Sequence, residues 1–246
     1  MAVSSDEEPG RSLWQEPERQ PEQLDWPALE FRDVFKIYRS GPVETVALRG
    51  LELSVERGGL VAVLGPSGCG KSTMLALAAA LDQPSAGEVR IGGRSLQRLD
   101  ELELATYRAR DVAIVFQSGN LWPSLSAREN VVACLRLSGH QDPDHEAEES
   151  LRALGLANRA RHRVGALSGG EQQRVAIAAA HARRAPLVLA DEPTGELDAG
   201  NEGRVLEALA RLRADRESTV IVVTHSPRVA GSAGRVVELR DGKVSA

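Results

Sequence analysis

The sequence is poor in cysteine and has no long apolar run, and each shortage excludes a class of protein. Two cysteines, Cys69 and Cys134, are too few for a disulfide framework or a cysteine-based metal site, which favours a reduced compartment. No stretch approaches the roughly 18 apolar residues that span a bilayer, and Met74 to Leu81 is among the longest. The N-terminus is acidic and lacks the apolar core of a secretory signal.

Positive charge is not in excess either. The 246 residues carry a net charge of −5, and residues 1–30 hold eight acidic residues against two arginines. The remainder is therefore nearly neutral, which argues against a nucleic-acid partner. Lysine occurs only at Lys36, Lys71 and Lys243, whereas arginine and alanine abound, as expected of a GC-rich bacterial genome.

The N-terminal segment differs in composition from the rest. Its acids, together with Pro9, Pro17 and Pro21, predict a disordered tail over residues 1–27, ahead of one domain at 28–246. Trp14 and Trp26 leave two interpretations of the tail open: no specific role, or docking on a partner.

Strand and helix patterns alternate through the domain. Alternating apolar positions predict strands at 30–38 and 45–56. Apolar runs predict further strands, buried on both faces in all but the last case, at 60–64, 112–116, 187–190, 219–224 and 236–239. Helical patterns occur at 72–81, 127–137, 145–154 and 169–182. The fold class predicted is α/β, a mostly parallel sheet with a helical insertion at about 118–186.

A glycine-rich loop follows the strand at 60–64 and precedes a helix. It matches the pattern Gly-x-x-x-x-Gly-Lys-Ser/Thr, in which backbone N–H groups and the helix N-terminus bind phosphate oxygens. Lys71 supplies a charge for the β- and γ-phosphates, and Ser72 a hydroxyl for Mg²⁺. The predicted nucleotide-binding residues here are Gly65, Pro66, Ser67, Gly68, Cys69, Gly70, Lys71, Ser72 and Thr73.

Polar residues end three other buried strands. Asp191 and Glu192 follow 187–190, where the first is placed to hold Mg²⁺ and the second to polarise a water that attacks the γ-phosphate. His225 follows 219–224 and could orient the γ-phosphate. Gln117 follows 112–116, and its amide can bind water and an oxygen ligand. Alone, His225 and Gln117 also have ordinary structural interpretations.

Over residues 28–246 the chain resembles the ATP-binding cassette ATPases. The family elements occur in order: the phosphate loop, the Q-loop at Gln117, the signature Leu-Ser-Gly-Gly-Glu-Gln-Gln at 167–173, the acidic pair at Asp191, the D-loop at 195–198 and the H-loop at His225. The resemblance implies a P-loop NTPase core with a mostly parallel sheet, an antiparallel β subdomain and a helical signature subdomain. It implies ATP and Mg²⁺ as cofactors.

The resemblance also implies residue roles. Glu192, His225, Gln117 and Lys71 would be catalytic, and Mg²⁺ would be held by Ser72, Gln117 and Asp191. Tyr38 would stack on adenine, although a strand aromatic facing the core is the alternative. Such domains form head-to-tail dimers that sandwich each ATP. The resemblance therefore implies that Ser168, Gly169 and Gly170 bind the γ-phosphate held by the partner subunit, and that Asp198 of the D-loop also belongs to the nucleotide site.

Two stretches resemble the lipoprotein-release and macrolide-export group, namely 116–130 and 189–198. That likeness implies a homodimer or pseudo-dimer bound to an integral membrane permease with a large extracytoplasmic domain, at the cytoplasmic face of a bacterial membrane. The predicted docking surface for the permease is an apolar cluster in the loop around Pro123, formed by Leu121, Trp122 and Leu125. The alternative is that Trp122 packs on the helical insertion.

Some features depart from the group, and two other functions stay open. Glu171 stands where glutamine is common, His181 where arginines are usual, and the acidic N-terminal extension is atypical. The open alternatives are an importer ATPase that works with a solute-binding protein and a signalling ATPase that controls cell-wall hydrolases. A DNA-repair ATPase of this family would have a long coiled coil between the phosphate loop and the signature, and a translation ATPase would carry two cassettes. This sequence has only a short helical insertion there and a single cassette, which excludes both types.

Overall fold

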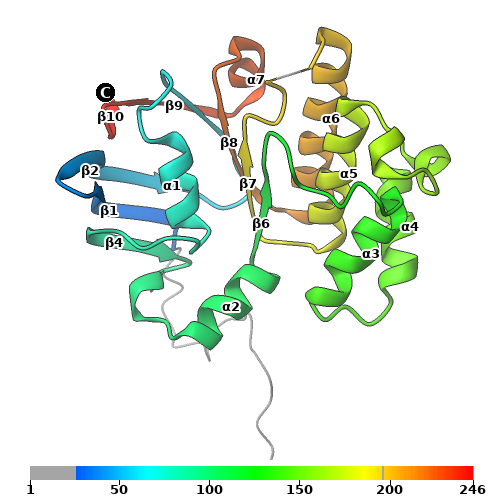
Figure 1. Cartoon of the computed structure of the whole chain (residues 1–246), viewed down its shortest axis with the longest axis horizontal. Helices are drawn as coiled ribbons and strands as arrows, with labels where there is room; N and C mark the ends of the chain where they lie inside the picture. Colours follow the sequence, from blue (N-terminus) through cyan, green and yellow to red (C-terminus); the bar gives the residue numbers. More distant parts are fainter. Residues whose placement is uncertain (1–25, 196, 246) are drawn as a thin grey trace, which may run out of the picture.

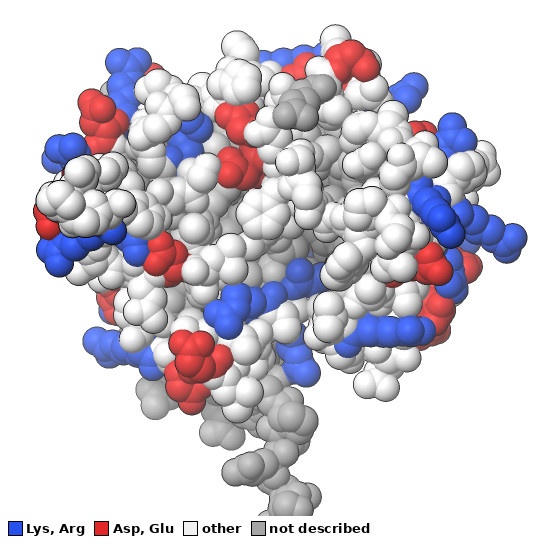
Figure 2. Space-filling model, in the orientation of Figure 1, with Lys and Arg blue, Asp and Glu red and all other residues white. Residues whose placement is uncertain are grey.

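The computed structural model describes residues 26–195 and 197–245, which form two sheets with helices packed around them. Figure 1 shows the smaller sheet at left, the larger sheet in the centre and a group of helices at right. Of the predicted tail, residues 1–25 with Trp14 lie outside the described residues. Figure 2 shows acidic and basic side chains interspersed over one face, as the nearly neutral body predicts.

The larger sheet is mostly parallel, which confirms the prediction from the apolar runs. Its order is β10-β9-β3-β8-β7-β6, and only β10 is antiparallel to its neighbour. All residues of β8 are buried, as in a sheet covered on both faces. The strands are β3 (Leu60–Leu64), β6 (Val112–Val115), β7 (Leu187–Asp191), β8 (Thr219–Thr224), β9 (Arg235–Arg240) and β10 (Lys243–Ser245).

The smaller sheet is antiparallel, in the order β2-β1-β4-β5. Its strands are β1 (Leu29–Ser40), β2 (Val43–Val55), β4 (Ala86–Ile91) and β5 (Arg94–Ser95). The β1–β2 hairpin turns at Gly41, whose φ of 58° is a left-handed conformation that glycine adopts without steric cost. Trp26, just before β1, packs on Gly93, because a Cβ there would lie 2.5 Å from the indole.

The helices confirm the predicted helical insertion and add three helices that the patterns did not predict, α2, α6 and α7. The helices are α1 (Lys71–Ala78), α2 (Glu101–Arg110), α3 (Ala127–Leu137), α4 (Pro143–Ala153), α5 (Gly169–Ala182), α6 (Ala199–Arg216) and α7 (Pro227–Ser232). Short 3₁₀ turns occupy Leu96–Arg98 (η1), Ala157–Arg159 (η2) and Val164–Ala166 (η3). Among the described residues, no helix is long and apolar enough to cross a membrane.

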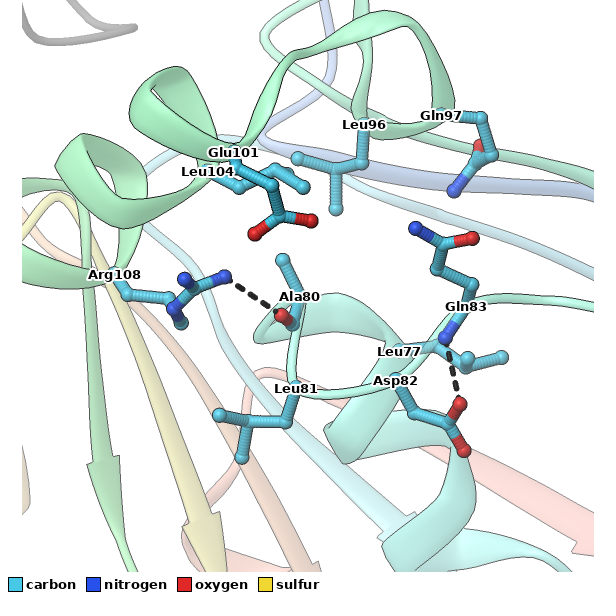
Figure 3. Close-up of a pocket in the computed structure, with 10 residues that line it drawn as sticks. All are labelled: Leu77, Ala80, Leu81, Asp82, Gln83, Leu96, Gln97, Glu101, Leu104 and Arg108. Carbon is cyan, nitrogen blue, oxygen red and sulfur yellow. Dashed lines mark hydrogen bonds between the residues drawn. The ribbon is translucent and has the colours of Figure 1, made fainter.

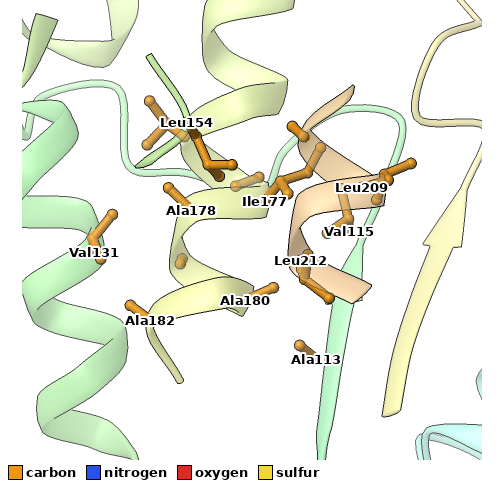
Figure 4. Close-up of a cluster of buried hydrophobic side chains, with 14 of the residues drawn as sticks. Ala113, Val115, Val131, Leu154, Ile177, Ala178, Ala180, Ala182, Leu209 and Leu212 are labelled. Carbon is orange, nitrogen blue, oxygen red and sulfur yellow. The ribbon is translucent and has the colours of Figure 1, made fainter. Parts of the chain in front are cut away.

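Helix α5 lies at the centre of the helical part. Its alanines allow α3, α4, α6 and β6 to pack closely around it. Figure 4 shows Ala178, Ala180 and Ala182 of α5 between Val131 of α3 and Leu212 of α6. The helix that begins at the signature is therefore anchored in a core that also contacts the parallel sheet.

Candidate nucleotide site

The phosphate loop joins β3 to α1 and is tightly packed at its base. Gly70 has a φ of 106°, and a Cβ on it would lie 2.5 Å from the carbonyl oxygen of Ala47 in β2. A Cβ on Gly65 would lie 2.3 Å from the carbonyl oxygen of Leu239 in β9. Glycine is therefore required at both positions. The residues that remain exposed on the loop and the first turn of α1 are Pro66, Ser67, Gly68 and Ser72.

Lys71 is held inside the loop. Its Nζ donates to the carbonyl oxygens of Gly65 and Pro66, each at 2.8 Å, and lies 3.9 Å from Sγ of Cys69. The side chain is buried, so the ammonium is fixed by the loop rather than by water. A phosphate bound in this loop would compete with these two carbonyls for the same cation.

Glu192 and His225 lie together at the carboxyl ends of β7 and β8. Nδ1 of His225 is 2.9 Å from Oε2 of Glu192, and the backbone N–H of His225 donates to the same oxygen at 3.3 Å. Glu192 has a φ of 46°, uncommon for a residue with a Cβ, and its N–H donates to the carbonyl of Val223 at 2.9 Å. Asp191 ends β7 directly before it. The sequence predicted both acids and His225 at this edge, and the structure brings Glu192 and His225 into contact.

Gln117 lies beside the turn that follows Glu192. A Cβ on Gly195 would be 3.4 Å from Nε2 of Gln117. The buried Gln173 of α5 donates through Nε2 to the backbone carbonyls of Phe116, at 3.1 Å, and Gln117. The sequence placed Gln173 in the signature without a role. The structure shows that Gln173 connects α5 with the loop after β6 through these hydrogen bonds.

Ser168 caps the N-terminus of α5 in a capping box with Glu171. The Ser168 hydroxyl accepts from the N–H of Glu171 at 3.3 Å, and the N–H of Ser168 donates to Oε2 of Glu171 at 2.9 Å. Arg159 donates through Nε to Oε1 of Glu171 at 2.7 Å. The Arg159 hydrogen bond, followed by that of the Ser168 backbone, lowers the pKa of Glu171 to about 2. Glu171, which departs from the lipoprotein-release and macrolide-export group, is therefore an ionised part of this helix end.

Of the remaining predicted residues, Gly169 and Gly170 begin α5, and Asp198 precedes α6. Gly170 is buried, and a Cβ on it would lie 2.7 Å from the Asn201 side chain, whereas Gly169 is exposed. Oδ1 of Asp198 accepts from the N–H groups of Gly200 and Asn201, each at 2.9 Å, and so caps α6. Within the described residues, no hydrogen bond joins 168–170 to the phosphate loop of the same chain.

Tyr38 is 42% exposed on β1, so its ring does not face the core. Its hydroxyl donates to Oδ2 of Asp82 at 3.1 Å, and Nζ of Lys36 lies 4.9 Å from the ring centroid. Lys36 also donates to Oδ1 of Asp82 at 2.6 Å. These contacts fix the ring, and no sequence pattern pointed to Asp82. Asp82 also lines a cavity of about 300 Å³ between α1 and α2, with Gln83, Gln97 and Glu101 around it (Figure 3).

His181, the other departure, is part of the core and not of the site. It is buried on α5, where its Nδ1 lies 3.0 Å from the hydroxyl of Ser150 on α4. Burial, and then the nearby Arg216, lowers the pKa of this imidazole. The residue therefore joins two helices as a buried polar contact.

Residues 48–195 match the family model described as ABC transporter. The chain is 44% identical over 89% of its length to the "Lipoprotein-releasing system ATP-binding protein LolD" of Geobacter metallireducens, covering 98% of that protein. It is also 44% identical over 89% of its length to the "Macrolide export ATP-binding/permease protein MacB" of Hyphomonas neptunium, of which it spans 34%, about a third.

A solved structure has the same fold. It is described as the "dimeric structure of a post-hydrolysis state of the ATP-binding cassette MJ0796 bound to ADP and Pi". The TM-score is 0.81 at 38% identity, covering 89% of this chain and 97% of that one. With the family match, these findings show that the chain belongs to the ABC transporter family, as an ATP-binding and ATP-hydrolysing subunit.

Proposed function

We propose that the chain hydrolyses ATP at the carboxyl edge of its parallel sheet. The observation that carries this proposal is the placement of three groups by adjacent strands. The phosphate loop follows β3, His225 follows β8, and the acidic pair ends β7, in a sheet whose order is β3-β8-β7. Parallel strands bring their carboxyl ends to one edge, where open α/β sheets bind ligands.

The donor set fits Mg²⁺ bound together with a nucleotide. Among the described residues, no three His, Cys, Asp or Glu side chains gather into a metal cage. Mg²⁺ commonly takes one or two protein oxygens and completes its shell with phosphate and water. We assign Ser72, Asp191 and the amide oxygen of Gln117 to it, and the ion would neutralise charge that develops on the phosphates.

Glu192 is the proposed general base. It accepts a proton from the water that attacks the γ-phosphorus, the bond to the bridging oxygen breaks, and ADP leaves with that electron pair. Its 2.9 Å contact with His225 would orient the carboxylate. Lys71 would leave its carbonyl partners for the β- and γ-phosphate oxygens, and Gln117 would orient the water.

We further propose that two chains close head to tail on ATP. Ser168, Gly169 and Gly170 would bind the γ-phosphate held by the partner's loop, with Asp198 beside the contact. The separation of the signature from the phosphate loop within one chain supports this assignment, as does the dimeric relative. The N-terminus of α5 favours an anion there.

The proposed partner is a membrane permease with a large extracytoplasmic domain, at the cytoplasmic face of a bacterial membrane. The names of the relatives support this class. Two hydrogen bonds to the Asn130 side chain fix the backbone of Trp122. The residue is nevertheless 48% exposed, so part of its indole is accessible to a partner. A cavity of about 330 Å³ runs from Leu121 and Pro123 to Gln117 and Glu192, which would connect a docked partner with the nucleotide.

Substitution of the proposed base tests this function. Glu192→Gln should retain ATP binding, lower turnover by about 10² to 10⁴-fold and accumulate the closed dimer with ATP. Nucleotide binding and sedimentation, compared with those of the wild-type chain, measure the two effects. Wild-type turnover of the variant in the assembled complex would contradict the assignment of Glu192.

A further inference from the structure

Four arginines line one cavity of about 650 Å³ on the side of the sheet away from the nucleotide edge. Arg57 precedes β3, Arg184 follows α5, and Arg213 and Arg216 belong to the last turn of α6. Pro186 and Thr219 place the cavity at the amino ends of β7 and β8, the lower end of these strands in Figure 1. Glu217 is the one acidic residue that lines it.

Three of the four arginines lack an ion-pair partner among the described residues. Within the described residues, none of the ion pairs shorter than 4.0 Å involves Arg184, Arg213 or Arg216. Nε of Arg216 is buried with no hydrogen-bond partner in that part of the chain. Burial and then repulsion by Arg184 lower the pKa of Arg216, and the acids Asp215, Glu149 and Glu146 offset this only in part. An anion bound between like charges relieves their repulsion.

The N-terminal segment enters the described structure at the rim of this cavity. Nε of Arg57 donates to the carbonyl oxygen of Trp26 at 3.3 Å. Residues 1–25 contain seven acidic residues and two arginines, so the net charge of −5 of the whole chain resides in them. Asp25 and Glu22 precede Trp26 by one and four residues, within a reach of about 14 Å even for an extended chain.

We propose that this arginine cavity binds carboxylates of the chain's own N-terminal segment, residues 1–25, with Glu22 and Asp25 nearest. Guanidinium groups bind carboxylates through paired, charge-assisted hydrogen bonds, which suits four arginines in one cavity. The tether keeps the carboxylates at a high effective concentration, so weak contacts suffice. The interaction relieves the repulsion between Arg184 and Arg216, and it also explains where the acidic surplus of the sequence is used.

Disulfide trapping in the full-length chain tests the proposal. Gln23→Cys lies between the two nearest acids, and Ala214→Cys lines the cavity on an exposed position, in a background with Cys134→Ser. Under mild oxidation we expect intramolecular trapping. Its rate should fall at least about fivefold when Arg184 and Arg213 are both changed to Gln. The same loss is expected in 1 M salt, where the Debye length is about 3 Å.

Matched variants separate binding from mere tethering. Arg152→Gln with Arg204→Gln removes the same charge from exposed positions outside the cavity and should leave the trapping rate unchanged. Glu22→Gln with Asp25→Asn should slow trapping as much as the cavity substitutions. A rate insensitive to the cavity arginines or to the two acids would overturn the proposal. It would then leave an acidic segment of another protein as the ligand.

Discussion

Removing the charge of Glu171 tests whether its ionised carboxylate stabilises the N-terminus of α5. The carboxylate accepts from Arg159 on one oxygen and from Ser168 on the other, at the N-terminus of α5. Glu171→Gln keeps an acceptor for the capping box but removes the ion pair and the favourable charge at the helix end. Arg159→Gln removes only the cation.

The magnitude follows from the exposure of the pair. The Arg159 side chain is 48% exposed, so the ion pair contributes about 0.2–1 kcal/mol and the helix-end charge about 0.3–1 kcal/mol. We expect Glu171→Gln to lower the free energy of unfolding by about 1 kcal/mol, or Tm by about 2–4 °C. The folded-state pKa of Glu171, about 2, lies below its ordinary 4.5. Its contribution is therefore complete above about pH 4.5 and disappears as the pH falls toward 2. Urea unfolding at several pH values measures this.

Measurements of ATP-driven dimerisation distinguish the effect of charge at the helix end from the effect of lowered stability. Arg159→Gln leaves an uncompensated carboxylate where the partner's γ-phosphate is proposed to bind, and should weaken dimerisation several-fold in a Glu192→Gln background. Glu171→Gln removes a negative charge there and should not weaken it, although both variants lower stability. A pH-independent difference in unfolding, or equal weakening of dimerisation by both variants, would refute the reasoning.

Three further predictions concern the docking surface, the adenine contact and the dimer. Trp122→Ala should reduce co-purification with the permease and leave nucleotide binding intact; unchanged assembly would contradict the docking surface. Tyr38→Ala should weaken ATP binding about tenfold without changing the affinity for inorganic triphosphate, which has no base to stack, as titrations of both ligands would show. A mixed dimer of Ser168→Arg and Lys71→Ala subunits should occlude one nucleotide, because both lesions fall in one composite site; none occluded would argue against the head-to-tail arrangement.

The fold was predictable where local patterns were strong. The five parallel strands of the larger sheet are short apolar runs, and the structure confirms each of them, whereas β10 was not predicted. Helix α6 was missed, although Val205, Ala208, Leu209 and Leu212 carry the helical spacing, because Gly200 and Gly203 weaken the pattern. Helix α2 buries only Leu104 and Tyr107, so its main sequence signal was the capping box that begins at Asp100.

Motifs predicted the candidate residues of the site, but not the contacts that support them. Glu192 and His225 are 33 residues apart, and each was predicted at the end of a buried strand, but the contact between them was not predicted. Gln173 and the carbonyl of Phe116 are 57 residues apart, and Tyr38 and Asp82 are 44 apart. No local pattern encodes such pairs, since each depends on how the helical part and the antiparallel sheet sit against the core.

The contacts of α5 link the signature to the loop that follows β6. At the start of the helix, the Ser168 hydroxyl also donates to Glu171 at 3.1 Å, so a phosphate that binds there must compete with this carboxylate. Just over one turn later, Gln173 holds the carbonyls of Phe116 and Gln117. Any shift of α5 relative to the sheet must therefore move this loop or break these bonds. Because the Gln117 amide lies beside the turn after Glu192, the hydrogen bonds of Gln173 connect the signature helix with the loop that borders this turn.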